Sequence, residues 1–351
     1  MTSIELLLRD KQTIIAETPR IRQRNLAAKL GISEAELLTL APDSTVIRLS
    51  GDWKLLLPKI KRMGYVMALT RNEACVHERK GVYDNINFYG GPANMGVAVN
   101  PDIDLRFFMN EWVHALAVTM DRGKMGMLYS FQFFNGEGEA VHKIFSTEKS
   151  NIDVYHQLVA EYRAEDQSPL FPLPKKEEAS TQETTKEDVD VEAFQQEWLN
   201  LKDTHDFFGL LRKYGLSRTR ALELAPLGHS QAVPVDFLKE VLQYCAAQAI
   251  PIMCFVHSKG CVQIHTGEVS QLKELGEWYN ILDPAFNLHL NMEMVKKAWI
   301  VKKPTVDGIV TSLELFDEDG ELIVYFFGAR KPGKPELETW REAINQFSLS
   351  C

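Results

Sequence analysis

The sequence predicts an α+β protein made of two homologous halves, each with short helices followed by mostly antiparallel strands. Two observations lead to this prediction. Stretches of the first half recur in the second, and the recurring stretches show helical spacing first and strand-like alternation later. The chain has 351 residues, 45% hydrophobic and 25% charged, which is ordinary globular composition. That length suits two domains of about 150 residues, each with its own core.

The first recurring stretch predicts a pair of short helices in each half. RNLAAKLGISEAELLTLAP at residues 24–42 aligns without a gap with FGLLRKYGLSRTRALELAP at residues 208–226. Apolar residues recur every three or four positions around a Gly-x-Ser turn. This pattern is typical of two helices, the second capped by Ser33 in one half and Ser217 in the other.

The second recurring stretch predicts a β-hairpin in each half. SFQFFNGEGEAVHKIF at residues 130–145 aligns with SLELFDEDGELIVYFF at residues 312–327, again without a gap. Apolar and polar residues alternate, and the alternation breaks at Gly136 or at Asp319-Gly320, as in a hairpin turn. Further strands are expected at the short apolar runs 65–69, 252–256 and 299–301.

A polar stretch separates the two halves. Residues 175–188, KKEEASTQETTKED, contain one apolar residue and follow the proline-spaced segment SPLFPLP. Such a segment cannot bury enough apolar surface to offset its ordering entropy. We therefore expect domains at residues 1–170 and 191–351, joined by an acidic flexible linker at 171–190.

Charge and cysteine usage limit the partners and the compartment. The net charge is −9 and no strong basic cluster appears, which argues against nucleic acid as a partner. LAAKLGISEAEL is close to a DNA-binding helix-turn-helix, but its would-be recognition helix, SEAELLTL, carries two glutamates and no basic residue. The five cysteines are odd in number and scattered, and no long apolar run or signal segment appears. We expect a soluble cytoplasmic protein without membrane insertion.

Common catalytic motifs are absent from the sequence. It contains no P-loop, no dinucleotide-binding glycine fingerprint, no G-x-S-x-G elbow and no H-E-x-x-H. If the protein carries out chemistry, we expect a cofactor to supply it.

One of the nine histidines occupies a position suited to a ligand. His205 lies just inside an expected helix N-terminus, capped by Asp203 or Thr204 and followed by Phe207-Phe208. Imidazole beside aromatic side chains suits a haem pocket, although spacing alone favours an ordinary surface histidine at a helix start. The alignment of the halves places Ile21 opposite His205, so the first half lacks this side chain.

A second histidine-containing stretch offers metal ligands at short spacing. In CFVHSKGCVQIH the four soft or borderline ligands are Cys254, His257, Cys261 and His265. The stretch resembles a zinc clip only loosely. A strand-turn-strand around residues 258–260 is the simpler interpretation.

Several stretches, in order and over essentially the whole chain, resemble one family. They are LAAKLGISEAEL, LTRNEACVHE, DLRFFMNEW, DTHDFFGLLRKYGLSR, KPTVDGIVTSLELFD and FGARKPGKPE. The chain resembles the HemS/ChuS/PhuS-type haemin-degrading and haem-trafficking proteins. The resemblance implies two repeats, each a large mainly antiparallel sheet with flanking helices. It also implies haem, iron protoporphyrin IX, held as ligand or substrate in a cleft between the halves.

The resemblance also implies the site residues. His205 is then the axial ligand of the haem iron, and Arg106 lies on the distal side, where it orients bound oxygen or water. Phe108 is the neighbouring aromatic wall. The basic residues implied on the C-terminal side of the pocket, where propionates need hydrogen-bonding cations, are Arg218, Lys303 and Arg330.

Two further points come from the same resemblance. His77 matches a histidine linked to a second haem contact in some members of the family. Tyr325 and Phe327 stand where some relatives have polar pocket residues, so the distal hydrogen-bond pattern is expected to differ here.

Two functions follow, from different classes. The first is an enzyme that opens the porphyrin ring with reductant and oxidant and releases iron. The second is a carrier that delivers haem to a separate haem oxygenase. We favour haem degradation. Besides haem, the expected partners are a haem importer, a reductase or a haem oxygenase.

Overall fold

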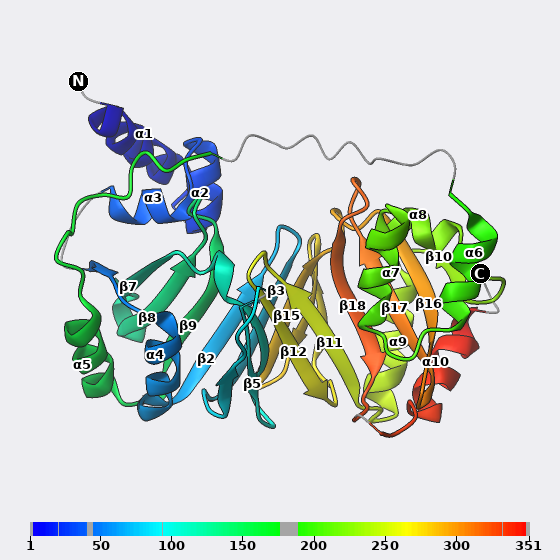
Figure 1. The fold of residues 1–351 in the computed structure, drawn as a ribbon. Coiled ribbons are helices and arrows are strands. Elements are labelled where there is room, and N and C mark those ends of the chain that lie inside the picture. Colours follow the sequence, from blue (N-terminus) through cyan, green and yellow to red (C-terminus); the bar gives the residue numbers. More distant parts are fainter. Residues whose placement is uncertain are drawn as a thin grey trace. The chain divides into compact units, whose positions relative to one another are not determined.

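The computed structural model describes residues 3–19, 21–40, 45–92, 94–175, 189–331 and 333–348. The α-helices are α1 (Ser3–Glu17), α2 (Gln23–Lys29), α3 (Glu34–Thr39), α4 (Trp53–Leu56), α5 (Ile152–Tyr162), α6 (Val191–Leu199), α7 (Asp206–Tyr214), α8 (Arg218–Glu223), α9 (Phe237–Ala247) and α10 (Glu338–Ser348). Short 3₁₀ helices are η1 (Leu57–Met63), η2 (Met109–Glu111) and η3 (Gly123–Met125). Figure 1 shows these elements.

The strands are, in chain order, β1 (Val46–Leu49), β2 (Gly64–Arg71), β3 (Cys75–Val82), β4 (Ile86–Phe88), β5 (Met95–Val99), β6 (Asp104–Phe108), β7 (His114–Asp121), β8 (Met127–Phe134), β9 (Ala140–Ser150), β10 (Ser230–Val233), β11 (Ile252–His257), β12 (Cys261–Gly267), β13 (Leu272–Leu275), β14 (Trp278–Leu282), β15 (Phe286–Asn291), β16 (Lys297–Thr305), β17 (Gly308–Phe316) and β18 (Leu322–Gly328). No described helix is long and apolar enough to span a bilayer.

The chain divides into two compact units. Unit 1 consists of Met1–Thr70, Arg79–Glu177 and Ser258–Val262, and unit 2 of Arg71–Glu78, Glu178–His257 and Gln263–Cys351. A short piece of each half is therefore counted with the other unit, and β3 and β12 each run from one unit into the other. Most of the expected linker, residues 176–188, lies outside the described residues.

Each unit contains the predicted antiparallel sheet. In unit 1 the hydrogen-bonded order is β1-β7-β8-β9-β2, with β4-β5-β6 as a further antiparallel set. In unit 2 the order is β10-β16-β17-β18-β11, with β13-β14-β15 as the second set. The predicted fold class, a duplicated α+β arrangement with large antiparallel sheets and flanking helices, is confirmed.

The local signals behind that prediction are also found in the structure. The Oγ atom of Ser33 accepts the backbone N–H of Glu36, and the Oγ atom of Ser217 accepts that of Arg220, so both serines are N-caps as expected. The hairpins β8-β9 and β17-β18 span the two aligned stretches. The strand expected at 299–301 is longer, since β16 extends over the whole of Lys297–Thr305.

Both faces of the unit 2 sheet are covered by helices. Leu313 and Leu315 of β17 pack in one cluster with α9 and α10, whereas Val301 of β16 packs in another with α6, α7 and α8. Ser312 pairs with Val301 across the ladder, and side chains alternate along a strand. Ser312 and Glu314 therefore face the α6–α8 layer, which carries the candidate site (Figure 1).

Candidate functional site

His205 is an exposed imidazole held by one carboxylate. Its side chain is 90% exposed, and Nδ1 lies 2.6 Å from Oδ1 of Asp203. The same oxygen accepts the backbone N–H of His205 at 2.8 Å. Among the described residues, nothing is seen to contact Nε2, so that nitrogen is open to a ligand.

The start of α7 differs from the expected one. The helix begins at Asp206, so His205 is the N-cap residue rather than the first helical position, and its side chain makes no capping bond. Asp203 lies two residues earlier, and its carboxylate binds His205 itself. The pKa of Asp203 is lowered, mainly by that backbone N–H and further by the His205 side chain and the charge of Arg330.

Exposed apolar side chains accompany His205. Phe208 is 62% exposed, while its neighbour Phe207 is buried in the α6–α8 cluster. The guanidinium of Arg212 lies 5.0 Å from the Phe208 ring centre. Val306, 78% exposed, donates its backbone N–H to the carbonyl of Lys202 at 3.0 Å. The segment around His205 thus exposes apolar groups that a flat hydrophobic ligand could cover.

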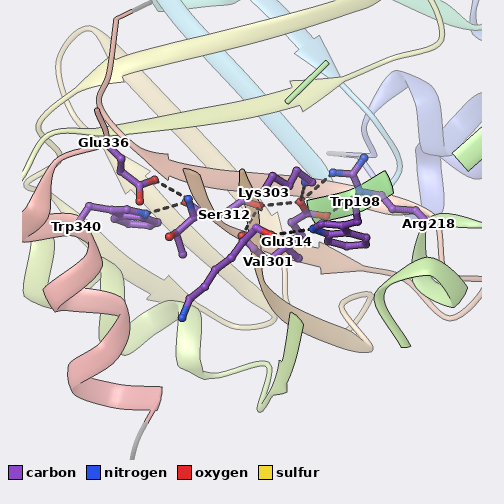
Figure 2. A network of polar contacts seen from close by, with 10 residues as sticks. Trp198, Arg218, Val301, Lys303, Ser312, Glu314, Glu336 and Trp340 are labelled. Atoms are coloured by element: carbon purple, nitrogen blue, oxygen red, sulfur yellow. Dashed lines mark hydrogen bonds and ion pairs between the residues drawn. The ribbon is translucent and has the colours of Figure 1, made fainter. Parts of the chain in front are cut away.

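Two of the predicted cations are bound to a carboxylate that the sequence analysis did not single out. Arg218 donates to both carboxylate oxygens of Glu314, at 2.7 and 2.9 Å, and Lys303 donates to it at 2.7 Å (Figure 2). Ser312 donates a further bond at 2.7 Å. Glu314 and Lys303 are buried, whereas the Arg218 side chain is 23% exposed. Lys303 therefore does not present its ammonium at the surface.

This buried network keeps its charges. Burial alone raises the pKa of Glu314, but the charges of Arg218 and Lys303 and their hydrogen bonds lower it far below its usual value. Burial lowers the pKa of Lys303 to about 8, although Glu314 opposes this. Both cations lie over the Phe207 ring, Lys303 at 4.5 Å and Arg218 at 5.4 Å. Through these contacts to Phe207, the network supports the first turn of α7.

Arg330 is the predicted cation that remains available. It is half-buried, and among the described residues no ion pair to it is seen. Its charge lowers the pKa of Asp203 and also acts on Glu336, so it lies within electrostatic reach of the carboxylate that holds His205. Such a guanidinium is suited to bind a ligand carboxylate.

Glu336 lies beside this region and accepts the backbone N–H of Thr311 at 2.8 Å; it is drawn with Trp340 in Figure 2. Burial raises its pKa to about 7 from the ordinary value of 4.5, and Thr311, Arg341 and Arg330 only partly oppose this. The folded chain therefore binds this proton more tightly than the unfolded chain does.

We predict that Glu336→Gln flattens the pH dependence of stability. The wild-type stabilisation by the protonated carboxyl is fully present below about pH 4.5 and is lost as the pH rises through about 7. Gln keeps the acceptor for Thr311 without ionising, so the variant should gain up to about 3 kcal/mol over wild type by pH 8. Urea unfolding at pH 5 and pH 8 measures this. Glu342→Gln, an exposed change on α10, is the control, and parallel behaviour of all three proteins would contradict the prediction.

The predicted residues of unit 1 lie on one strand. Along β6, Leu105 and Phe107 are buried, and Asp104, Arg106 and Phe108 alternate with them on the opposite face. Arg106 forms an ion pair with Asp104 and also donates to the carbonyl of Leu105 at 3.1 Å. Its side chain is 33% exposed. Arg106 and Phe108 thus lie on the same face of β6.

The other histidines and cysteines give less support to a binding role. His77 is fully buried, with its ring 4.9 Å from that of Phe286, so a haem contact there would require this packing to open. The ring of His265 stacks on Phe286 at 3.8 Å. Among the described residues, no cluster of three or more His, Cys, Asp or Glu side chains could hold a metal ion, and Cys254 and Cys261 are buried free thiols.

Tyr325 and Phe327 belong to an aromatic cluster on β18. Tyr325 stacks on Phe255 of β11 with ring centres 4.9 Å apart, and Phe327 meets the same ring edge-on at 5.2 Å. The guanidinium of Arg218 lies 5.7 Å from the Tyr325 ring. These residues supply apolar surface and a cation–π contact.

A pocket of about 520 Å³ lies in unit 1, and its lining includes Arg48, Trp53, Lys54 and His114. It contains none of the predicted ligand-binding residues. Burial, and next the charge of Arg48, lower the pKa of His114.

The duplication shows that the features around His205 belong to one copy. In the two gap-free alignments, the counterpart of Arg218 is Glu34, and continuing the second alignment by three residues places Glu148 opposite Arg330. Val301 pairs with Ser312, and Val118 pairs with Ser130, which aligns with Ser312; Val118 is therefore the counterpart of Val301. Two residues further along these strands, Met120 is the counterpart of Lys303. With Ile21 opposite His205, unit 1 has no ligand and two reversed charges at these positions.

Fold and site together define a class: a tandem α+β duplication in which, among the described residues, the second copy carries an exposed histidine held by a carboxylate, and Arg330 lies within electrostatic reach of that carboxylate. The family model of the haemin-degrading HemS.ChuX domain matches the chain twice, at residues 31–162 and 215–347. The chain belongs to this family, which confirms the resemblance found from the sequence.

Relatives match over nearly the full length. The chain is 36% identical over 336 residues to the hemin transport protein HemS of Yersinia enterocolitica, covering 95% of this chain and 94% of that protein. The structure of holo-PhuS, a heme-binding protein from Pseudomonas aeruginosa, matches with a TM-score of 0.91 and 43% identity over 98% of both chains. ChuS, a heme degrading enzyme of Escherichia coli O157:H7, matches with a TM-score of 0.89 and 32% identity, covering 98% of this chain and 99% of that one.

Proposed function

We propose that this protein binds haem with His205 as the axial ligand of the iron and degrades it, opening the porphyrin ring to release iron. The observation that carries the proposal is the exposed imidazole of His205, whose Nδ1 is held by Asp203 and whose Nε2 is open. The names of the relatives, a hemin transport protein, a heme-binding protein and a heme degrading enzyme, support the same ligand.

The residues present fit haem chemically. A neutral imidazole is an iron ligand, and the exposed Phe208 and Val306 offer apolar surface to a porphyrin face. Arg330 is half-buried and shows no ion pair among the described residues, so its guanidinium suits a propionate, and the Arg218 side chain is 23% exposed. Bound haem would supply the redox chemistry, while these side chains bind and orient it.

Degradation is distinguished from transport by an absorbance time course. Purified protein receives one equivalent of haemin, then reductant under air, with and without catalase. Loss of the Soret band that survives catalase and yields a defined linear tetrapyrrole and free iron supports the enzyme. A stable spectrum, or bleaching that catalase abolishes, supports a carrier that passes haem to a separate oxygenase, a role that an exposed ligand also suits.

Arg106 provides a test of the enzymatic role. The family resemblance assigns it to the distal side, where a charged donor orients oxygen or water. We predict that Arg106→Ala keeps haem affinity but slows turnover by on the order of 100-fold, the loss typical of one positioned donor. Haem titration and product analysis measure the two effects. Arg122→Ala, an exposed change in the same unit, is the control, and equal turnover in both variants would remove Arg106 from the mechanism.

The proposal includes a cytoplasmic location and partners that deliver haem or electrons. A haem importer or a reductase suits the enzyme, and a separate haem oxygenase suits the carrier. Four described cysteines are buried free thiols, which agrees with a reducing compartment.

A further inference from the structure

Asp203 makes two hydrogen bonds to His205, one to its backbone and one to its ring, and they have different roles. Its Oδ1 accepts the backbone N–H of His205 at 2.8 Å, which forms the turn that leads into α7. The same Oδ1 lies 2.6 Å from the imidazole Nδ1. A turn would need only the first bond, because an N-cap or Asx turn is complete once the backbone N–H is satisfied.

The second bond fixes which ring nitrogen carries the proton. An ionised carboxylate accepts hydrogen bonds and cannot donate one, so the neutral imidazole must place its proton on Nδ1. The lone pair is then on Nε2, the nitrogen that faces solvent. The imidazole is 90% exposed and no other described group is seen to hold it, so this bond is also what restrains the ring.

The duplicated half supports a joint role for the two side chains. In the gap-free alignment, extended five residues upstream, Pro19 stands opposite Asp203 and Ile21 opposite His205. Proline can neither accept a side-chain hydrogen bond nor orient an imidazole. The carboxylate is present in the half that has the histidine and absent from the half that lacks it.

We propose that Asp203 is a positioning residue that sets the tautomer, orientation and electron donation of His205 toward the haem iron. This inference rests on the proposed function, in which His205 is the ligand. Outer carboxylates of this kind raise the electron donation of a ligating imidazole, and their loss typically costs 10–100-fold in metal affinity. An imidazole that donates more electron density favours ferric over ferrous iron, so Asp203 also lowers the reduction potential of the bound haem.

Asp203→Asn is the informative variant. Asn keeps an oxygen that can accept the backbone N–H, so the turn into α7 is retained. Its amide can instead donate to Nδ1, which allows the proton to move to Nε2 and blocks the ligand position. Asp206→Asn is the matched control, since it removes the same charge from the next acidic residue, at the first position of α7.

The first measurement uses the full-length protein without haem. Nitrogen-15 NMR of the labelled histidines reports which ring nitrogen carries the proton. We expect the Nδ1–H tautomer of His205 in wild type and in Asp206→Asn, and a shift toward Nε2–H in Asp203→Asn. A predominant Nε2–H form in wild type would overturn the proposal, whatever the protein does with haem.

The second measurement uses the haem-loaded protein. We expect Asp203→Asn to lose 10–100-fold in ferric haem affinity and to show a more positive reduction potential, with Asp203→Glu partly restoring both. An unchanged potential in Asp203→Asn would overturn the inference. If His205→Ala keeps wild-type spectra, the proposed ligand is wrong, whereas the NMR result on Asp203 still stands, so the two failures are distinguishable.

Discussion

Replacing His205 with alanine is expected to abolish most high-affinity haem binding and to shift the Soret band. The loss should exceed the ~10–100-fold that removal of an outer partner of a metal ligand costs. The side chain is 90% exposed and supports no packing, so the fold should be unaffected. Haem titration by absorbance, with circular dichroism as the check on folding, measures both effects.

Two further variants make this result specific. His229→Ala removes another histidine of the same unit, a half-buried one just before β10, and should leave the spectrum unchanged. In His205→Gly, free imidazole should enter the vacated position and restore the wild-type Soret band, because solvent reaches that position directly. Unchanged affinity and spectrum in His205→Ala would exclude this residue as the ligand.

The sequence was sufficient to predict the architecture because repetition doubles each local signal. A single helix-pair or hairpin pattern is weak evidence for that element. The same pattern at two matched places, with Ser33 and Ser217 both at N-cap positions, is specific evidence. The assignment of residues 71–78 and 258–262 to opposite units was not predictable. It depends on contacts between distant segments, which local pattern does not contain.

Burial explains why part of the site was missed. In SLELF the alternation suggests that Ser312 and Glu314 face solvent, as on a half-covered sheet. The α6–α8 layer covers that face, so Glu314 is buried, and Lys303, which could pass for a surface charge, is buried with it. The sequence predicts Asp203 only as a helix cap, because spacing indicates a possible backbone bond but not the 2.6 Å contact to the imidazole.

Glu314→Gln is expected to destabilise the protein by about 3–5 kcal/mol, the cost of removing one partner from a buried ion pair. The substitution keeps the shape but leaves Lys303, which is 3% exposed, with a buried charge and no carboxylate in its present contacts. Gln itself suits this position in the fold, since Gln132 is its counterpart in unit 1, where Glu34 and Lys143 form the ion pair. The cost therefore comes from charge rather than from packing.

Chemical unfolding of wild type and Glu314→Gln at pH 7 and below pH 4 measures the difference in their free energies of unfolding and its dependence on pH. Because the folded-state pKa of Glu314 is depressed, its stabilisation is complete above the ordinary value of 4.5 and is lost as the pH falls through the folded value. The gap between wild type and variant should therefore shrink in acid. Glu318→Gln, an exposed change in the same hairpin, should show no gap at either pH.

The double variant Glu314→Gln/Lys303→Met separates stranded charge from lost hydrogen bonds. Methionine removes the ammonium while keeping length and apolar bulk, so the double variant should be more stable than Glu314→Gln alone. Arg218 can turn its 23% exposed side chain toward water and needs no substitution. If the two substitutions change the free energy of unfolding additively, the ion pair does not couple β16 to β17.

Glu314→Gln should also weaken haem binding. Lys303 and Arg218 both lie over the Phe207 ring, so loss of their carboxylate partner should loosen the start of α7.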